Sequence, residues 1–160
     1  MGLKKIIILV AVGLMVLILG SVAYNKMKVE IFQEKLFISN ISKIIIDTED
    51  KSYTITDKEK ISGIVKKASK LNKLYKVEND NLDKLNMLGR QYSKMKINPK
   101  YRQLIVIYKD KIDLTLGGRF LIDNNNLIFE CNGYVWNISD ELLNEISNSI
   151  KSAESINIKK

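Results

Sequence analysis

Acidic residues are the first candidates for chemistry in this chain. Many hydrolases use two carboxylates, one as a general acid and one as a base or nucleophile. The spacing offers two such pairs and one isolated acid on the polar face of a predicted strand: Asp80 with Asp83, Asp110 with Asp113, and Glu130. No sequence motif holds either pair in place. A carboxylate-dependent hydrolase is therefore the third of three functional hypotheses.

The other common catalytic groups are missing or single. The sequence has no histidine and one cysteine, Cys131. Zinc sites, Ser-His-Asp triads, Cys-His dyads and an intramolecular disulfide are therefore excluded within this chain. Gly117 and Gly118 are predicted to form a turn between two strands rather than a phosphate-binding loop. We expect no enzyme activity, no metal site and no cofactor.

Basic residues with tyrosines between them dominate residues 90–102. Such a surface suits anionic lipids or polymers. The candidate contact residues are Arg90, Tyr92, Lys94, Lys96, Lys100, Tyr101 and Arg102. With the net charge of +8, they support the second hypothesis, a basic anion-binding module that contacts acidic lipids or wall polymers. A solvated loop is the alternative for this segment, and no nucleic acid is expected as a partner.

An uncharged apolar stretch, residues 6–24, indicates where in the cell the candidate residues lie. As a helix it would span about 28 Å, close to the ~30 Å hydrocarbon core of a bilayer. Lys4 and Lys5 precede the stretch, and Lys26 and Lys28 follow it. This pattern predicts a single-pass transmembrane helix that anchors the chain in the cell membrane.

The same stretch is also compatible with a cleaved signal peptide. Ser21 and Ala23 occupy the small positions of a cleavage site, and cleavage after Ala23 would secrete the domain. We favour the anchor, because the uncharged run is longer than a typical signal core. The short N-terminal tail favours an inside N-terminus, so we expect the C-terminal domain to be extracytoplasmic.

The strand pattern behind the anchor predicts an antiparallel sheet. A connector, residues 26–37, is compatible with a continuing helix or with a first strand. Tight-turn residues separate short β-branched or aromatic runs, which favours hairpins. The expected strands are a first hairpin, 43–48 and 52–55, and a meander, 104–108, 112–116, 119–123, 127–131 and 134–138.

Two helices are expected to pack on this sheet. Thr56 and Glu59 have the spacing of a capping box, and an apolar stripe follows them. Ser139 is predicted to cap a closing helix. A further short helix is expected within residues 79–88. The chain is thus predicted to be α+β, with these parts: 1–25 anchor or signal peptide, 26–37 connector, 38–155 domain and 156–160 tail.

The last hairpin can be predicted residue by residue. Asn132-Gly133 is a strong signal for a two-residue turn. Such a turn pairs Cys131 with Tyr134 and Phe129 with Trp136, and directly opposed residues share one face of the sheet. That face is apolar, so Cys131 is expected to be buried as a small hydrophobic residue.

Two segments carry a family resemblance: ISKIIIDTEDKSYTITDKEKISGIV at 41–65 and LIFECNGYVWNISDELLNEI at 127–146. They resemble a family of small uncharacterised membrane-anchored or lipoprotein-like extracytoplasmic domains of Gram-positive bacteria. The resemblance implies a strand pair, a helix that starts at "ITD", and a late "NG" hairpin that leads into a final helix. It implies no activity, and no site residues transfer from it.

The leading functional hypothesis combines the anchor with the missing catalytic groups. It is a membrane-anchored, extracytoplasmic, non-enzymatic interaction or sensory-accessory domain. Its expected partners are the membrane itself and a membrane or cell-envelope protein, with anionic lipid or wall polymer as the ligand under the second hypothesis.

Overall fold

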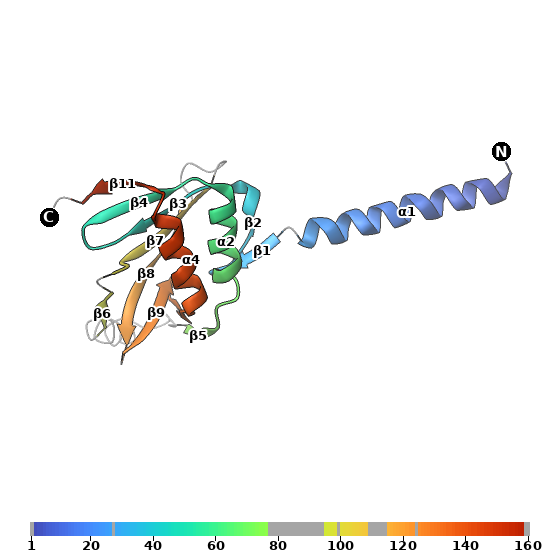
Figure 1. Cartoon of the computed structure of the whole chain (residues 1–160). Coiled ribbons are helices and arrows are strands. Elements are labelled where there is room, and N and C mark those ends of the chain that lie inside the picture. The colour runs from blue at the N-terminus through green and yellow to red at the C-terminus, as the bar shows by residue number, and fades with distance from the viewer. Residues whose placement is uncertain are drawn as a thin grey trace.

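The computed structural model describes residues 2–26, 28–76, 95–98, 100–108, 115–123 and 125–158. The first helix, α1 (Leu3–Lys26), projects away from a domain formed by the rest of the described chain (Figure 1). Within it, Lys5–Tyr24 has a mean hydropathy of 3.0, and none of it is buried. The length and composition of α1 are those of a membrane-spanning helix or a signal sequence.

One antiparallel sheet forms the body of the domain, and nine strands contribute to it in the described part of the chain. From one edge to the other, its strands are β11 (Glu154–Asn157), β4 (Lys51–Ile55), β3 (Ile41–Asp47), β7 (Gln103–Tyr108), β8 (Thr115–Asp123), β9 (Asn126–Cys131), β10 (Tyr134–Asn137) and β5 (Lys73–Lys76). The short β6 (Lys96–Ile97) pairs with β8 beyond the start of β7. The predicted α+β class and the β7–β10 meander are confirmed.

Strand β8 corrects one prediction. It runs without a break through Gly117 and Gly118, which were expected to form a turn. Gly118 is buried under the neighbouring strand, and a Cβ atom there would lie 2.6 Å from Cε1 of Phe129. Gly118 therefore leaves space for the Phe129 ring. The local sequence does not distinguish a glycine with this packing role from a glycine in a turn.

Two helices cover one face of the sheet, as predicted (Figure 1). α2 (Lys58–Ala68) and α4 (Asp140–Ile150) turn their apolar stripes toward the core, and Lys67 forms an ion pair with Glu145 between them. Ser139 caps α4 as expected. The cap of α2 is Asp57 rather than Thr56, because its carboxylate accepts hydrogen bonds from the first-turn amides of residues 59 and 60.

The predicted connector and the start of the predicted tail both contribute strands to the fold. The connector forms a separate hairpin, β1 (Lys28–Ile31) and β2 (Glu34–Phe37), followed by a short 3-10 helix, η1 (Ile38–Asn40). Phe32 and Gln33, with φ of 48° and 73°, make its two-residue turn. At the other end, β11 extends past residue 155 into the predicted tail, where it pairs with β4.

Candidate functional site

The acidic candidates do not form a described catalytic site. Asp80, Asp83, Asp110 and Asp113 lie outside the described residues. Glu130 has a structural role: its carboxylate lies 3.1 Å from Nη2 of Arg119 and accepts a hydrogen bond from the amide of residue 133. Within the described ranges, no group of three or more acidic or cysteine side chains is arranged to hold a metal ion.

The structure describes only part of the basic segment, residues 90–102. Arg90, Tyr92 and Lys94 lie outside the described residues, as does the helix expected within 79–88. Lys96 on β6 is exposed. Lys100 and Arg102 are also exposed, and Nη2 of Arg102 lies 3.7 Å from a carboxylate oxygen of Glu49.

Tyr101 belongs to the core rather than to a contact surface. The side-chain oxygen of Asn98 accepts hydrogen bonds from the amides of Lys100 and Tyr101, at 2.8 and 2.9 Å. This turn separates β6 from β7 and directs Tyr101 inward, where it is 2 % exposed and its ring lies 5.9 Å from that of Phe120. A tyrosine between basic residues is therefore not available to a ligand here.

A shallow depression of about 540 Å³ adjoins this turn. Its lining combines two acids and one lysine with uncharged residues: Thr48, Glu49, Asp50, Tyr53, Lys100, Tyr101 and Ile150. Positive charge is not concentrated in it, since Glu49 and Asp50 offset Lys100. The depression gives no specific support to anion binding, and the second hypothesis stays a prediction.

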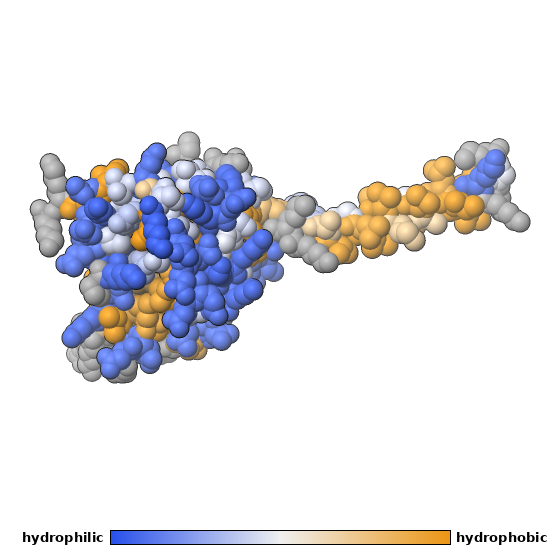
Figure 2. All heavy atoms as spheres, viewed as in Figure 1, coloured by the Kyte–Doolittle hydropathy of each residue, from blue (hydrophilic) through white to orange (hydrophobic). Residues whose placement is uncertain are grey.

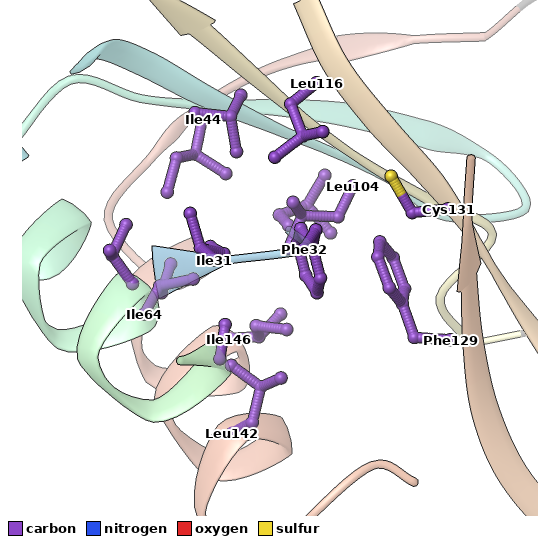
Figure 3. Close-up of a cluster of buried hydrophobic side chains, with 14 of the residues drawn as sticks. Ile31, Phe32, Ile44, Ile64, Leu104, Leu116, Phe129, Cys131, Leu142 and Ile146 are labelled. Atoms are coloured by element: carbon purple, nitrogen blue, oxygen red, sulfur yellow. The ribbon is translucent and has the colours of Figure 1, made fainter. Parts of the chain in front are cut away.

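The feature that the sequence did not predict is the burial of the hairpin formed by β1 and β2, which we call the core hairpin. Ile31 is 1 % exposed and Phe32 is 4 % exposed. The Phe32 ring stacks on Phe129 at 4.3 Å and meets Trp136 edge-on at 5.4 Å. Figure 3 shows Ile31 and Phe32 between side chains of α2 and α4 on one side and side chains of the sheet on the other. The only local signal was the apolar pair Ile31-Phe32. The surrounding sequence was equally compatible with a helix.

The core hairpin also contacts the end of α1. Its strand β1 is the link between α1 and the domain (Figure 1). The ring centroids of Tyr24 on α1 and Phe37 on β2 are 4.8 Å apart. Nζ of Lys28 lies 4.9 Å from the Tyr24 ring centroid and 5.2 Å from that of Phe37, within cation–π range. We call Tyr24, Lys28 and Phe37 the helix-end cluster.

Cys131 lies in the core, as the hairpin register predicted. The observed pairs are Cys131 with Tyr134 and Phe129 with Trp136. The thiol is 1 % exposed, and burial, followed by the negative charges of Glu130 and Glu34, raises the pKa of Cys131 to about 12. Burial and the charge of Glu34 likewise raise the pKa of Tyr108 to about 12. Both groups are therefore neutral at physiological pH.

Burial and the raised pKa predict a slow reaction of Cys131 with thiol reagents. The thiolate is the nucleophile, and at neutral pH the folded protein exposes almost none of it. We expect a bulky maleimide to leave the folded chain unlabelled and to label it fully in denaturant, as measured by mass spectrometry. Stoichiometric labelling without denaturant would contradict the burial of this side chain.

Searches against protein-family models, curated proteins and solved structures returned no match for this chain.

Proposed function

We propose that the protein is a membrane-anchored, extracytoplasmic, non-enzymatic interaction or sensory-accessory domain. α1 anchors the chain, and the domain presents its surface to a membrane or cell-envelope partner. The core hairpin joins these two parts, since it follows α1 directly and packs in the centre of the domain.

The observation that carries this proposal is the exposure of α1. Leu14 and Leu17 are 56 % and 71 % exposed, and apolar side chains cover the helix along its length. Figure 2 shows this continuous apolar surface on α1, whereas the visible face of the domain is mostly hydrophilic. In water such a helix would expose far more contiguous apolar surface than soluble proteins tolerate, and hydrocarbon removes that cost.

Retention of the anchor is the second part of the proposal. α1 continues as a helix through Ser21 and Ala23, the expected cleavage positions, to Lys26. The Tyr24 ring beyond them contacts the domain at Phe37. These contacts support an anchor that remains attached to the domain, rather than a signal peptide that is removed.

A topology experiment tests both parts of the proposal. In intact cells, a membrane-impermeant protease is expected to digest the domain, and alkaline carbonate is expected to leave the full chain in the membrane pellet. Protection of the domain would contradict the extracytoplasmic orientation. A mature N-terminus at Tyr24 would show that the segment is a cleaved signal.

A charged variant provides the control for insertion. Leu14→Arg combined with Leu17→Arg adds about 6 kcal/mol to the cost of a transmembrane helix. The variant is expected to leave the membrane pellet, whereas Leu14→Ile with Leu17→Ile is expected to stay in it. Chemical cross-linking in membranes from cells that express the full chain would then identify partner proteins.

A further inference from the structure

The helix-end cluster places part of the domain at the level of the lipid headgroups. This step rests on the proposed function, in which α1 spans the bilayer. Tyr24 is the last residue of the apolar span Lys5–Tyr24. Tyrosine at the end of a span lies at the boundary between hydrocarbon and headgroups. The headgroup region is only about 5–8 Å thick on each side of the hydrocarbon.

The measured contacts then locate two further side chains. The Phe37 ring centroid lies 4.8 Å from that of Tyr24, and Nζ of Lys28 lies 4.9 Å from the same ring. Both distances are smaller than the thickness of the headgroup region. Phe37 and Lys28 therefore reach the headgroup level whenever Tyr24 is at the boundary.

The core hairpin links this position to the core of the domain. Lys28 and Phe37 are cross-strand partners in the core hairpin. The same hairpin inserts Ile31 and Phe32 into the centre of the domain. A paired strand hairpin, rather than an unstructured linker, thus connects the headgroup level to the core.

The face of the core hairpin that carries Lys28 has the composition of a lipid-contacting surface. The alternation along the strands puts Lys28, Glu30, Lys35 and Phe37 on one face, while Val29 and Leu36 on the other face pack against the core. Glu30 is opposite Lys35 and offsets its charge. Lys28 is opposite Phe37, so no carboxylate faces its amine across the hairpin.

We propose that Lys28, Phe37 and Tyr24 form a phospholipid headgroup site, in which the Lys28 ammonium binds the lipid phosphate and the two rings lie at the hydrocarbon boundary. An anionic lipid is favoured over a zwitterionic one, because Lys28 then meets a headgroup with a net negative charge. The site lies on the core hairpin and is separate from residues 90–102.

Lipid photo-cross-linking in the full chain tests this site. Benzoylphenylalanine replaces Phe37 in protein reconstituted in bilayers of mixed anionic and zwitterionic lipid. We expect lipid adducts enriched about fivefold in the anionic lipid, the ratio that one lysine near an anionic surface provides. Lys28→Gln is expected to abolish the enrichment, and Lys151→Gln, an exposed lysine on the C-terminal side of α4, is expected to leave it unchanged.

Probes at two other positions separate the possible failures. A probe at Leu17 reports whether α1 is in the bilayer at all, and a probe at Tyr53 on β4 controls for random contact. Adducts at Leu17 without adducts at position 37 would overturn the headgroup site and leave the anchor intact. Absence of adducts at both would overturn the proposed anchor together with the site. Adducts at position 37 without anionic enrichment would overturn the role of Lys28.

Discussion

Phe32→Ala is expected to lower the free energy of unfolding of the domain by about 3–5 kcal/mol, the usual cost of removing a buried phenylalanine. The Phe32 side chain is 4 % exposed and contacts the rings of both Phe129 and Trp136. Its removal leaves a cavity between the helices and the sheet, which the rigid strands around it can fill only in part. The same change also removes the aromatic contacts of the core hairpin with the sheet.

Equilibrium denaturation of the full chain in detergent micelles measures this effect. Trp136 is the only tryptophan and lies in the core, so its fluorescence reports unfolding. Circular dichroism provides a second probe, because Phe32 itself contacts Trp136. Ile156→Ala, at a side chain that is 72 % exposed, is the control and should change the free energy by less than about 0.5 kcal/mol. A loss below about 1 kcal/mol for Phe32→Ala would mean that the hairpin is not part of the core.

Gly118→Ala is expected to cost about 3 kcal/mol, at the upper end of the range for overpacked interiors. The added methyl group would overlap with the carbonyl oxygen of Glu130 and with the Phe129 ring. The carbonyl is part of the β8–β9 ladder and cannot move without breaking it. The Phe129 ring is equally confined, because it is stacked on Phe32.

The adjacent glycine supplies a matched control. A Cβ atom at position 117 would lie 3.7 Å from the nearest atom, Cγ1 of Ile105, which is an ordinary van der Waals contact. Gly117→Ala should therefore be neutral or slightly stabilising, because alanine loses less backbone entropy in a strand. Denaturation curves for the two variants side by side test this. Equal losses at both positions would indicate a turn, as the sequence pattern suggested, rather than a packing requirement at one residue.

Both substitutions act on the same stack of aromatic rings, which packs the core hairpin against the sheet. Phe32 comes from the core hairpin and Phe129 from the sheet, and Gly118 leaves the space that Phe129 occupies. Loss of this stack should detach the hairpin from the core while α1 stays intact. β1 follows α1 directly and ends at the buried residue Ile31, which precedes the buried Phe32.

The sequence by itself determined the features that depend on local chemistry. The long uncharged run predicted a helix with the length and apolarity that a bilayer requires, and α1 has both. The Asn132-Gly133 turn set the register of the last hairpin, and with it the burial of Cys131, because two positive φ angles leave few alternatives. The α+β class, the apolar helix stripes and the cap at Ser139 follow from periodicity and hydrogen bonding within a few residues of chain.

Only the tertiary structure decided the features that depend on distant partners. Tyr101 looked like a contact residue among basic neighbours, and the Asn98 turn and the Phe120 ring make it a core residue. Gly118 looked like a turn, and Phe129 on the next strand explains it. The connector was compatible with helix or strand. It forms a hairpin whose apolar side chains pack between the helices and the sheet. In each case the deciding atoms are supplied by another element of the fold, so no local pattern around the residue records them.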